Sequence, residues 1–374
     1  MRQLQGLILV AMALVLAACS SSGKRPQPAD LGTEPQILKI VPSWRASIGA
    51  VGFFMEAKVV GEQLALASSD GTVAVINAQN GSDIWRQSVG SSLSAGVGFD
   101  GRWAAVVTRN NELVTLEQGR ELWRQRLSAQ GFTPPLVAGN RVFVLTADRS
   151  VQAFDAQSGR RLWTQQRAGE PLALRQSGVL VPVGNTLVAG LSGRLVGMDP
   201  LNGSSRWEAA LATPRGTNDI ERLVDLVAPI GRTGNVLCAR AFQAAVGCVD
   251  AQRGNLLWSK PANGQLGLAN LGNMVVGSES DGTLLAWRLD NGERIWNSEL
   301  LRWRYLGAMT ALPSALLVAD STGFVHFVSP KDGALLARVR TEGGSELVAA
   351  PVVAGSLIVT VARNGQVQAW RIAE

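Results

Sequence analysis

The chain has 374 residues, 46% of them hydrophobic, so it is long enough to bury a large core. Its formal net charge of +6 would suit an anionic partner, but the basic residues are scattered along the chain, which argues against nucleic-acid binding. It has one histidine, His326, in an alternating strand, and no HExxH, calcium-loop or phosphate-loop motif, so none of these signatures supports an enzyme.

The N-terminus has the features of a bacterial lipoprotein signal. Met1-Arg2 is followed by an apolar run and then by Leu16-Ala17-Ala18-Cys19. A basic start, an apolar stretch and small residues before a cleavage point are typical of an export signal. A cysteine at that point resembles the lipobox, which implies removal of residues 1–18 and acylation of Cys19, palmitate included. Because Ser20 rather than an aspartate follows, the pattern resembles outer-membrane sorting.

The segment after the lipobox is predicted to be a linker. Residues 19–35 are rich in serine and contain Pro26 and Pro28, so we expect a flexible tether. No later segment is long and apolar enough to cross a bilayer. Residues 36–374 are therefore expected to form a periplasmic domain that lipid alone holds to the membrane.

From residue 36 onward the chain repeats a unit of about forty residues. In one copy an alternating strand starting at Thr72 leads to a turn with Gly81, and then to a hydrophobic residue and Trp85. Later copies end at tryptophans spaced 38 to 51 residues apart: Trp123, Trp163, Trp207, Trp258 and Trp296. Such a period with β character predicts a β-propeller. We expect each tryptophan to pack between blades, where its burial contributes at most about 4–6 kcal/mol.

The two ends of the chain complete the count of units. A seventh unit has Ala337 in place of tryptophan, and an eighth begins at Asn364 and stops before its own tryptophan. Its missing strand is at the other end, where Trp44 lies 41 residues before Trp85 in a similar stretch. The sequence thus predicts an all-β fold over 36–374: an eight-bladed propeller of four-stranded antiparallel blades, the last closed by the N-terminal strand.

Two cysteines lie inside the repeats. The repeat alignment places Cys238 at the position of Ala65 and Cys248 at that of Val75, nearly opposite each other on two strands of one hairpin. An oxidising compartment permits a cross-strand disulfide, and two packed thiols are the alternative.

The spacing of the units identifies two insertions. From the tryptophan to the asparagine that opens the second strand, the interval is 17 residues after Trp123 and 15 after Trp258. It is 22 residues after Trp163 and 28 after Trp207. The extra residues therefore lie in two consecutive connections between blades, on the face of the ring that also carries the Asp-Gly hairpins. Loops longer than the repeat requires are a reasonable place for function.

One cluster combines basic and aromatic residues, Leu301-Arg302-Trp303-Arg304-Tyr305. We interpret it as a strand rim with solvated arginines, and a binding stripe is the alternative. His326 is likewise interpreted as a packing residue of its strand.

The repeat itself resembles that of the pyrroloquinoline-quinone (PQQ) dehydrogenases. The shared pattern is Asp-x-x-x-Gly-x-x-x-Trp after alternating strands, as in Asp155 to Trp163. Those eight-bladed enzymes are typically much longer, and many carry adjacent cysteines beside the cofactor, which this chain lacks. The resemblance keeps open an alternative function, a PQQ-dependent quinoprotein-like enzyme or a periplasmic ligand-binding propeller, because a fold alone does not determine function.

The chain as a whole is similar to the BamB family, lipoproteins of the outer-membrane-protein assembly (BAM) complex. Gly169–Arg175 looks like the family's Leu-x-Leu-Arg segment, and Gly216–Asp225 looks like its acidic Arg-Leu-x-Asp segment. In the family these loops contact the POTRA domains of BamA. The resemblance therefore implies four BamA-binding residues here: Leu172, Leu174, Arg175 and Asp225. Val227 stands where the family often has a second acid.

The same resemblance implies the function. It indicates a non-catalytic scaffold that binds the POTRA domains of BamA and aids the folding and insertion of outer-membrane proteins. We expect a monomer within a hetero-oligomeric complex, lipid-anchored at the periplasmic face of the cell outer membrane, with no cofactor, metal or nucleic acid. Nascent outer-membrane proteins are a further expected partner, pairing with an exposed outer strand.

Overall fold

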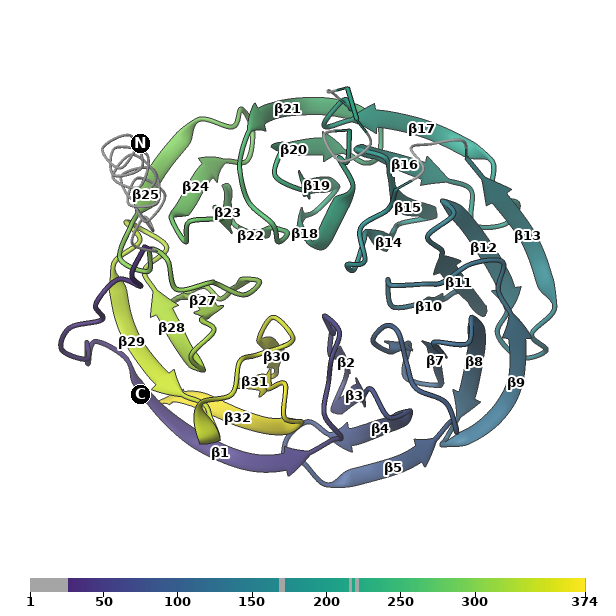
Figure 1. Ribbon diagram of the computed structural model, residues 1–374, viewed down its shortest axis with the longest axis horizontal. Helices are drawn as coiled ribbons and strands as arrows, with labels where there is room; N and C mark the ends of the chain where they lie inside the picture. The colour runs from purple at the N-terminus through teal and green to yellow at the C-terminus, as the bar shows by residue number, and fades with distance from the viewer. Residues whose placement is uncertain (1–25, 168–171, 215–216, 219–221, 374) are drawn as a thin grey trace, which may run out of the picture.

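The chain folds into a ring of eight four-stranded antiparallel sheets (Figure 1). The computed structural model describes residues 26–167, 172–214, 217–218 and 222–373. The predicted signal peptide, 1–18, and Cys19 lie outside these residues. Among the residues described, no helix is long and apolar enough to cross a membrane. The predicted all-β, eight-bladed propeller is confirmed.

In seven blades the strands run outward from the centre in chain order, and in the eighth the N-terminal strand is the outermost. The first four blades comprise β2 (Lys58–Val60), β3 (Gln63–Ala67), β4 (Thr72–Asn77) and β5 (Asp83–Ser88); β6 (Gly98–Phe99), β7 (Trp103–Val107), β8 (Glu112–Glu117) and β9 (Arg120–Arg126); β10 (Leu136–Ala138), β11 (Arg141–Leu145), β12 (Ser150–Asp155) and β13 (Arg161–Gln166); and β14 (Leu180–Val183), β15 (Thr186–Leu191), β16 (Arg194–Met198) and β17 (Ser205–Ala210).

The strands of the other four blades are given in the same way, from the centre outward. They comprise β18 (Leu226–Thr233), β19 (Val236–Ala241), β20 (Ala245–Asp250) and β21 (Asn255–Pro261); β22 (Ala269–Leu271), β23 (Met274–Ser278), β24 (Leu284–Arg288) and β25 (Arg294–Ser298); β26 (Thr310–Ala311), β27 (Leu316–Ala319), β28 (Phe324–Val328) and β29 (Leu335–Arg340); and β30 (Val352–Ala354), β31 (Leu357–Val361), β32 (Gln366–Ala373) and β1 (Lys39–Ser47). A short 3₁₀ turn, η1, spans Glu342–Gly344.

Tryptophan and glycine lock neighbouring blades together. The ring of Trp44 packs on Gly81 of the next blade, and its indole N–H donates to the carbonyl of Ala78 at 3.0 Å. Gly81 has a φ of 75°, and a Cβ there would lie 2.5 Å from the Trp44 ring. Only glycine can adopt this positive φ without strain and also leave room for the ring. The same contact recurs around the ring in six further pairs: Trp85 with Gly119, Trp123 with Gly159, Trp163 with Gly203, Trp207 with Gly254, Trp258 with Gly292 and Trp296 with Gly333.

The seam between the seventh and eighth blades has no such pair. β1 pairs antiparallel with β32, and Trp44 lies opposite Ala369. At the seam with the seventh blade, Ala337 is buried, and the backbone N–H groups of Ile37 and Leu38 donate to the carbonyl of Leu336 at 3.0 and 3.3 Å. The glycine turn is missing here because the chain ends fall at this point, and backbone hydrogen bonds hold the seam instead.

Cys238 and Cys248 lie opposite each other in the fifth blade, on β19 and β20. The structure joins them in a disulfide, with their Cα atoms 4.0 Å apart. Their placement matches the repeat alignment, and their oxidation in the purified protein stays a prediction.

Candidate protein-interaction site

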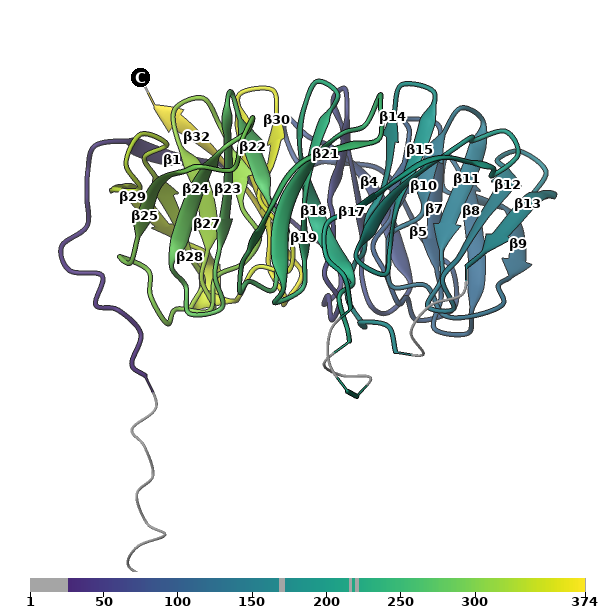
Figure 2. The same cartoon turned by 90° about the horizontal axis from the view of Figure 1, so that it is seen from above.

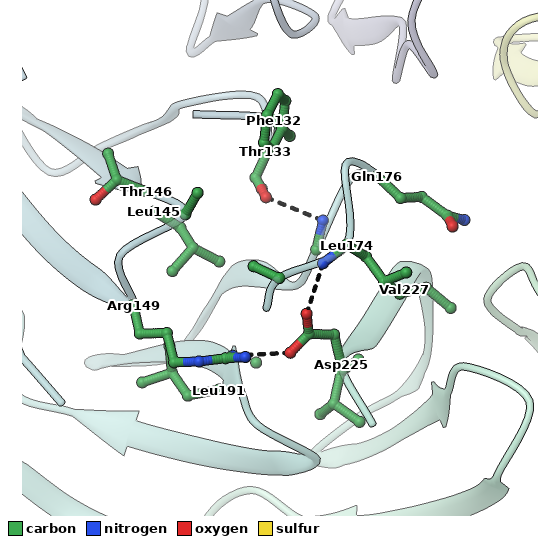
Figure 3. Close-up of a pocket in the computed structure, with 15 residues that line it drawn as sticks. Phe132, Thr133, Leu145, Thr146, Arg149, Leu174, Gln176, Leu191, Asp225 and Val227 are labelled. Atoms are coloured by element: carbon green, nitrogen blue, oxygen red, sulfur yellow. Dashed lines mark hydrogen bonds and ion pairs between the residues drawn. The ribbon is translucent and has the colours of Figure 1, made fainter. Parts of the chain in front are cut away.

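The two insertions project from one face of the ring. They follow β13 and β17, and Figure 2 shows the described parts of both connections at the lower face of the propeller. Residues 168–171, 215–216 and 219–221, which hold part of both predicted segments, lie outside the described residues. The described parts converge on the pocket shown in Figure 3.

Asp225 joins the two insertions to each other. One carboxylate oxygen accepts the backbone N–H of Leu174 at 2.9 Å, so the end of the second insertion holds the middle of the first (Figure 3). The other oxygen pairs with the guanidinium of Arg149 at 2.8 Å. The same guanidinium donates to the carbonyl of Leu172 at 2.7 Å. Charge-assisted bonds of this kind are about twice as strong as neutral ones, so this three-way contact fixes both loops in one arrangement.

Arg149 occupies a backbone position that favours glycine. It lies in the β11–β12 hairpin with a φ of 61°, where the corresponding hairpins have Gly71 at 102° and Gly282 at 85°. A side chain in this left-handed region costs about 1–2 kcal/mol. The Arg149 side chain is nonetheless buried, 8% exposed. The bonds to the two insertions offset the free-energy cost of the positive φ, which explains why an arginine occupies this position.

The carboxylate beside Arg149 in sequence stabilises the hairpin itself. Burial alone raises the pKa of Asp148, but hydrogen bonds from the hydroxyls of Thr146 and Ser128 outweigh it, and the pKa is lowered below its usual value. The carboxylate therefore stays charged and holds the turn that presents Arg149.

Further contacts attach the first insertion to neighbouring blades. The hydroxyl of Thr133 accepts the backbone N–H of Gly178 at 2.9 Å, and the amide of Gln176 donates to the carbonyl of Gln265 at 2.9 Å. Thr133 precedes β10 in the third blade, and Gln265 precedes β22 in the sixth. The loop thus spans connections from both sides of its own blade.

The four predicted residues differ in what they present. Leu172 is 43% exposed, and Arg175 is also exposed, with its guanidinium 5.8 Å from the centre of the Phe132 ring. Leu174 and Asp225 are half-buried and line the pocket. The structure brings all four together, but Leu172 and Arg175 face outward, whereas Asp225 is engaged inside the protein.

The pocket between the loops is small. Its volume is about 50 Å³, and its lining combines apolar side chains such as Leu145 and Leu191 with the Arg149–Asp225 pair. Cofactor sites usually occupy about 300–1,000 Å³, so this cavity is too small for a quinone. A second hollow of about 110 Å³ continues the surface toward the first two blades and is lined by Phe53, Phe54, Phe132, Arg109 and Arg175, among others.

Aromatic and arginine side chains on adjoining hollows are typical of protein–protein interfaces. Sequence reasoning located the two loops but missed Arg149. The signal that identifies it is the interruption of the Asp-Gly hairpin pattern, because Asp148-Arg149 stands where other units have Asp70-Gly71 or Asp281-Gly282.

Comparisons with known proteins agree with the resemblance found in the sequence. Residues 69–298 match a family described as outer membrane protein assembly factor BamB. The protein of that name from Burkholderia pseudomallei (strain K96243) is 36% identical over 366 residues, 96% of each chain. The one from Bordetella pertussis (strain Tohama I) is 33% identical over 371 residues, 97% of this chain and 96% of that protein.

Solved structures support the fold. The crystal structure of BamB from Moraxella catarrhalis superposes with a TM-score of 0.81 at 21% identity, covering 89% of this chain and 100% of that one. Quinohemoprotein alcohol dehydrogenase from Comamonas testosteroni gives 0.67 at 14% identity, covering 91% of this chain and 78% of that one, which shows a shared propeller only. With a family match over more than half its length and relatives that align nearly end to end, this chain belongs to the BamB family of outer membrane protein assembly factors.

Proposed function

We propose that this chain is a non-catalytic scaffold that binds the POTRA domains of BamA through the face built by its two insertions. The observation that carries the proposal is the Asp225 carboxylate, which joins Leu174 to Arg149 and so holds both loops as one surface. A preorganised surface loses little conformational entropy on binding, which favours affinity.

Within this surface the residues divide into contact and positioning roles. The exposed Leu172 offers an apolar anchor, and the exposed guanidinium of Arg175 beside Phe132 offers a cation with an aromatic neighbour. Arginine is one of the residue types that dominate interface energies when a partner covers them, and the leucine adds apolar contact area. Asp225 is already paired inside the protein, so its role is to hold Leu174 and the contact residues in place.

We extend the proposal to the location of the protein. Removal of residues 1–18 and acylation of Cys19 would attach the propeller to the periplasmic face of the outer membrane. The lipobox sequence supports this placement, and mass spectrometry of the membrane-extracted protein tests it through the mass of the N-terminal peptide.

The binding proposal is tested by reversing the charge of the exposed arginine. We expect Arg175→Glu to abolish co-purification with BamA from detergent-solubilised outer membranes while leaving thermal unfolding unchanged. The matched control is Arg160→Glu, since Arg160 is an exposed arginine in the β12–β13 turn on the opposite face. Undiminished recovery of BamA by Arg175→Glu would place the interface elsewhere.

Two further parts of the proposal need separate tests. The non-catalytic role predicts no calcium-dependent dye reduction after addition of the quinone, and turnover would contradict it. Direct contact with nascent outer-membrane proteins predicts slower deuterium exchange in an outer strand such as β13 when an unfolded client is added. No protection in any outer strand would remove the client contact.

A further inference from the structure

We infer that the connection between the sixth and seventh blades, residues 299–307, is a membrane-contact surface that touches phospholipid headgroups when the chain is anchored. This inference rests on the proposed acylation of Cys19. It concerns a part of the ring remote from the two insertions along the circumference, on the same face (Figures 1 and 2). We call residues 299–307 the blade 6–7 loop.

The blade 6–7 loop holds two aromatic residues in a backbone conformation that they rarely adopt. Trp303 has a φ of 61° and Tyr305 a φ of 52°, both in the left-handed region. Bulky side chains there are uncommon and cost free energy, and such residues gather at functional sites. Two side chains of the loop are exposed, since 73% of Tyr305 and 49% of Leu300 are accessible to solvent.

The loop is also rigid, because its arginines are tied to the ring. Arg302 pairs with Asp281 at 3.0 Å and with Glu299 at 3.2 Å. Arg304 pairs with the buried carboxylate of Asp320 at 2.7 Å. The loop therefore presents Tyr305 and Leu300 on a fixed base.

The N-terminal segment runs to the same loop. The backbone N–H of Ala29 donates to the carbonyl of Arg302 at 2.8 Å, and the guanidinium of Arg304 donates to the carbonyl of Ala29 at 2.9 Å. Arg338 donates to the carbonyls of Leu31 and Gly32, each at 2.8 Å. Figure 2 shows this purple segment passing outside the ring from β1 to the face that bears the long loops. Residues 29–32 of the predicted tether are thus docked on the propeller.

Chain length then limits how far the loop can lie from the bilayer. Cys19 is ten residues before Ala29, so a fully extended chain spans at most about 35 Å between them. An acylated Cys19 would keep the blade 6–7 loop within this reach of the membrane surface. At such a short tether length, even a weak contact is populated, because the effective concentration of the surface is high.

The exposed side chains suit a lipid interface. Tyrosine and tryptophan are enriched at the headgroup level, where the ring is apolar and its polar atom stays hydrated. Leu300 adds an exposed aliphatic group, while Arg302 is occupied by Asp281 and Glu299 and holds the loop in place. The docked tether favours a membrane over a protein partner as the occupant, since it delivers the anchor to this loop.

The test uses the fact that Tyr305 is the only tyrosine in the chain. Full-length lipoprotein labelled with 3-fluorotyrosine gives a single ¹⁹F signal from this residue. The protein is reconstituted in nanodiscs of phosphatidylethanolamine and phosphatidylglycerol, with and without a gadolinium-chelating lipid. We expect the gadolinium lipid to broaden the Tyr305 signal beyond detection.

The control moves the reporter to the other face of the ring. In the double variant Tyr305→Phe, Leu201→Tyr, the fluorotyrosine lies in the β16–β17 turn, where Leu201 is 62% exposed. We expect its signal to persist under the same conditions. Equal broadening at both positions, or none at Tyr305 in a lipoprotein whose acylation is verified by mass, would overturn the membrane contact and leave the BamA proposal intact.

Two other outcomes also overturn the inference. A Cys19 without lipid in the mass spectrum would remove the anchor on which the contact depends. Broadening or a shift of the Tyr305 signal on adding soluble POTRA domains without lipid would assign the surface to a protein partner.

Discussion

Arg149 and Asp225 form an ion pair of 2.8 Å between two blades, although they lie 76 residues apart in the chain. The pair connects the β11–β12 hairpin to the residue that precedes β18. Through Leu172 and Leu174 it also holds the first insertion. The arginine therefore reinforces the direct bond between Asp225 and Leu174 that joins the two insertions.

The first prediction concerns Arg149→Gly, which replaces the arginine with the residue that its positive φ favours. Arg149→Gly loses a charged contact of about 2 kcal/mol and gains about 1 kcal/mol from relief of the positive φ. We expect only a small decrease in the free energy of unfolding, because the two effects oppose each other. Deuterium exchange at residues 172–176 should rise and BamA recovery should fall.

Asn111→Gly is the matched control for this prediction. Asn111 occupies the corresponding hairpin of the second blade, with a φ of 60°. The change relaxes the backbone there without touching the insertions, so exchange at 172–176 should stay as in the parent protein. If deuterium exchange at residues 172–176 were unchanged in Arg149→Gly, the order of the two insertions would not depend on Arg149.

The sequence predicted the repeat and not this pairing, for a physical reason. A blade is a local structure, and each unit carries its own signals in a turn glycine and a tryptophan such as Gly81 and Trp85. The spacing also located the insertions. A contact between Arg149 and Asp225 depends on how two blades pack, which no local pattern encodes. Likewise, residues 29–32 have the composition of a linker, and their docking depends on backbone hydrogen bonds to arginines far along the chain.

The second prediction compares a seam that has a tryptophan with the one that lacks it. Trp123→Ala should lower the free energy of unfolding by about 3–5 kcal/mol, because the indole ring fills the space beside Gly159 and its N–H donates to the carbonyl of Ala156.

Ala337→Trp, at the seam without a tryptophan, should not stabilise the protein in the same way. Ala337 is 3% exposed and belongs to an apolar cluster that includes Trp370 and Leu38, so a larger side chain overfills the seam and costs about 1–3 kcal/mol.

Chemical denaturation followed by tryptophan fluorescence measures both variants. If Ala337→Trp were more stable than the parent protein, the seam between the seventh and eighth blades would have room for a tryptophan.

The third prediction is a pH dependence that arises from Asp320. Burial alone raises the pKa of this carboxyl, but hydrogen bonds with His326, Thr322 and Arg304 outweigh it and lower the pKa well below its usual value. Because the folded-state pKa lies below the unfolded one, the stabilisation is complete above about pH 4 and is lost as the pH falls further.

Asp320→Asn should therefore destabilise the protein by about 3 kcal/mol at pH 7, since it leaves buried Arg304 without its charge partner. The difference from the parent should narrow between about pH 4 and pH 2. Urea unfolding across this range measures it, and a constant difference would contradict the assignment. Because Arg304 also holds Ala29, the variant should show faster deuterium exchange at residues 29–32.

The last prediction is the redox state of the two buried cysteines. Cys238 and Cys248 are both fully buried and directly opposite on β19 and β20, so a bridge between them closes a short loop in the unfolded chain. A loop of this length reduces the entropy of the unfolded state by an equivalent of about 3 kcal/mol in the chain-entropy account.

We expect intact mass spectrometry under non-reducing conditions, after denaturation with a thiol-blocking reagent, to find both cysteines unmodified. Reduction should lower the free energy of unfolding by about 2–3 kcal/mol, whereas the Cys238→Ser, Cys248→Ser variant should not respond to reductant. Two blocked thiols in the untreated protein would exclude the disulfide and leave two packed thiols in the fifth blade.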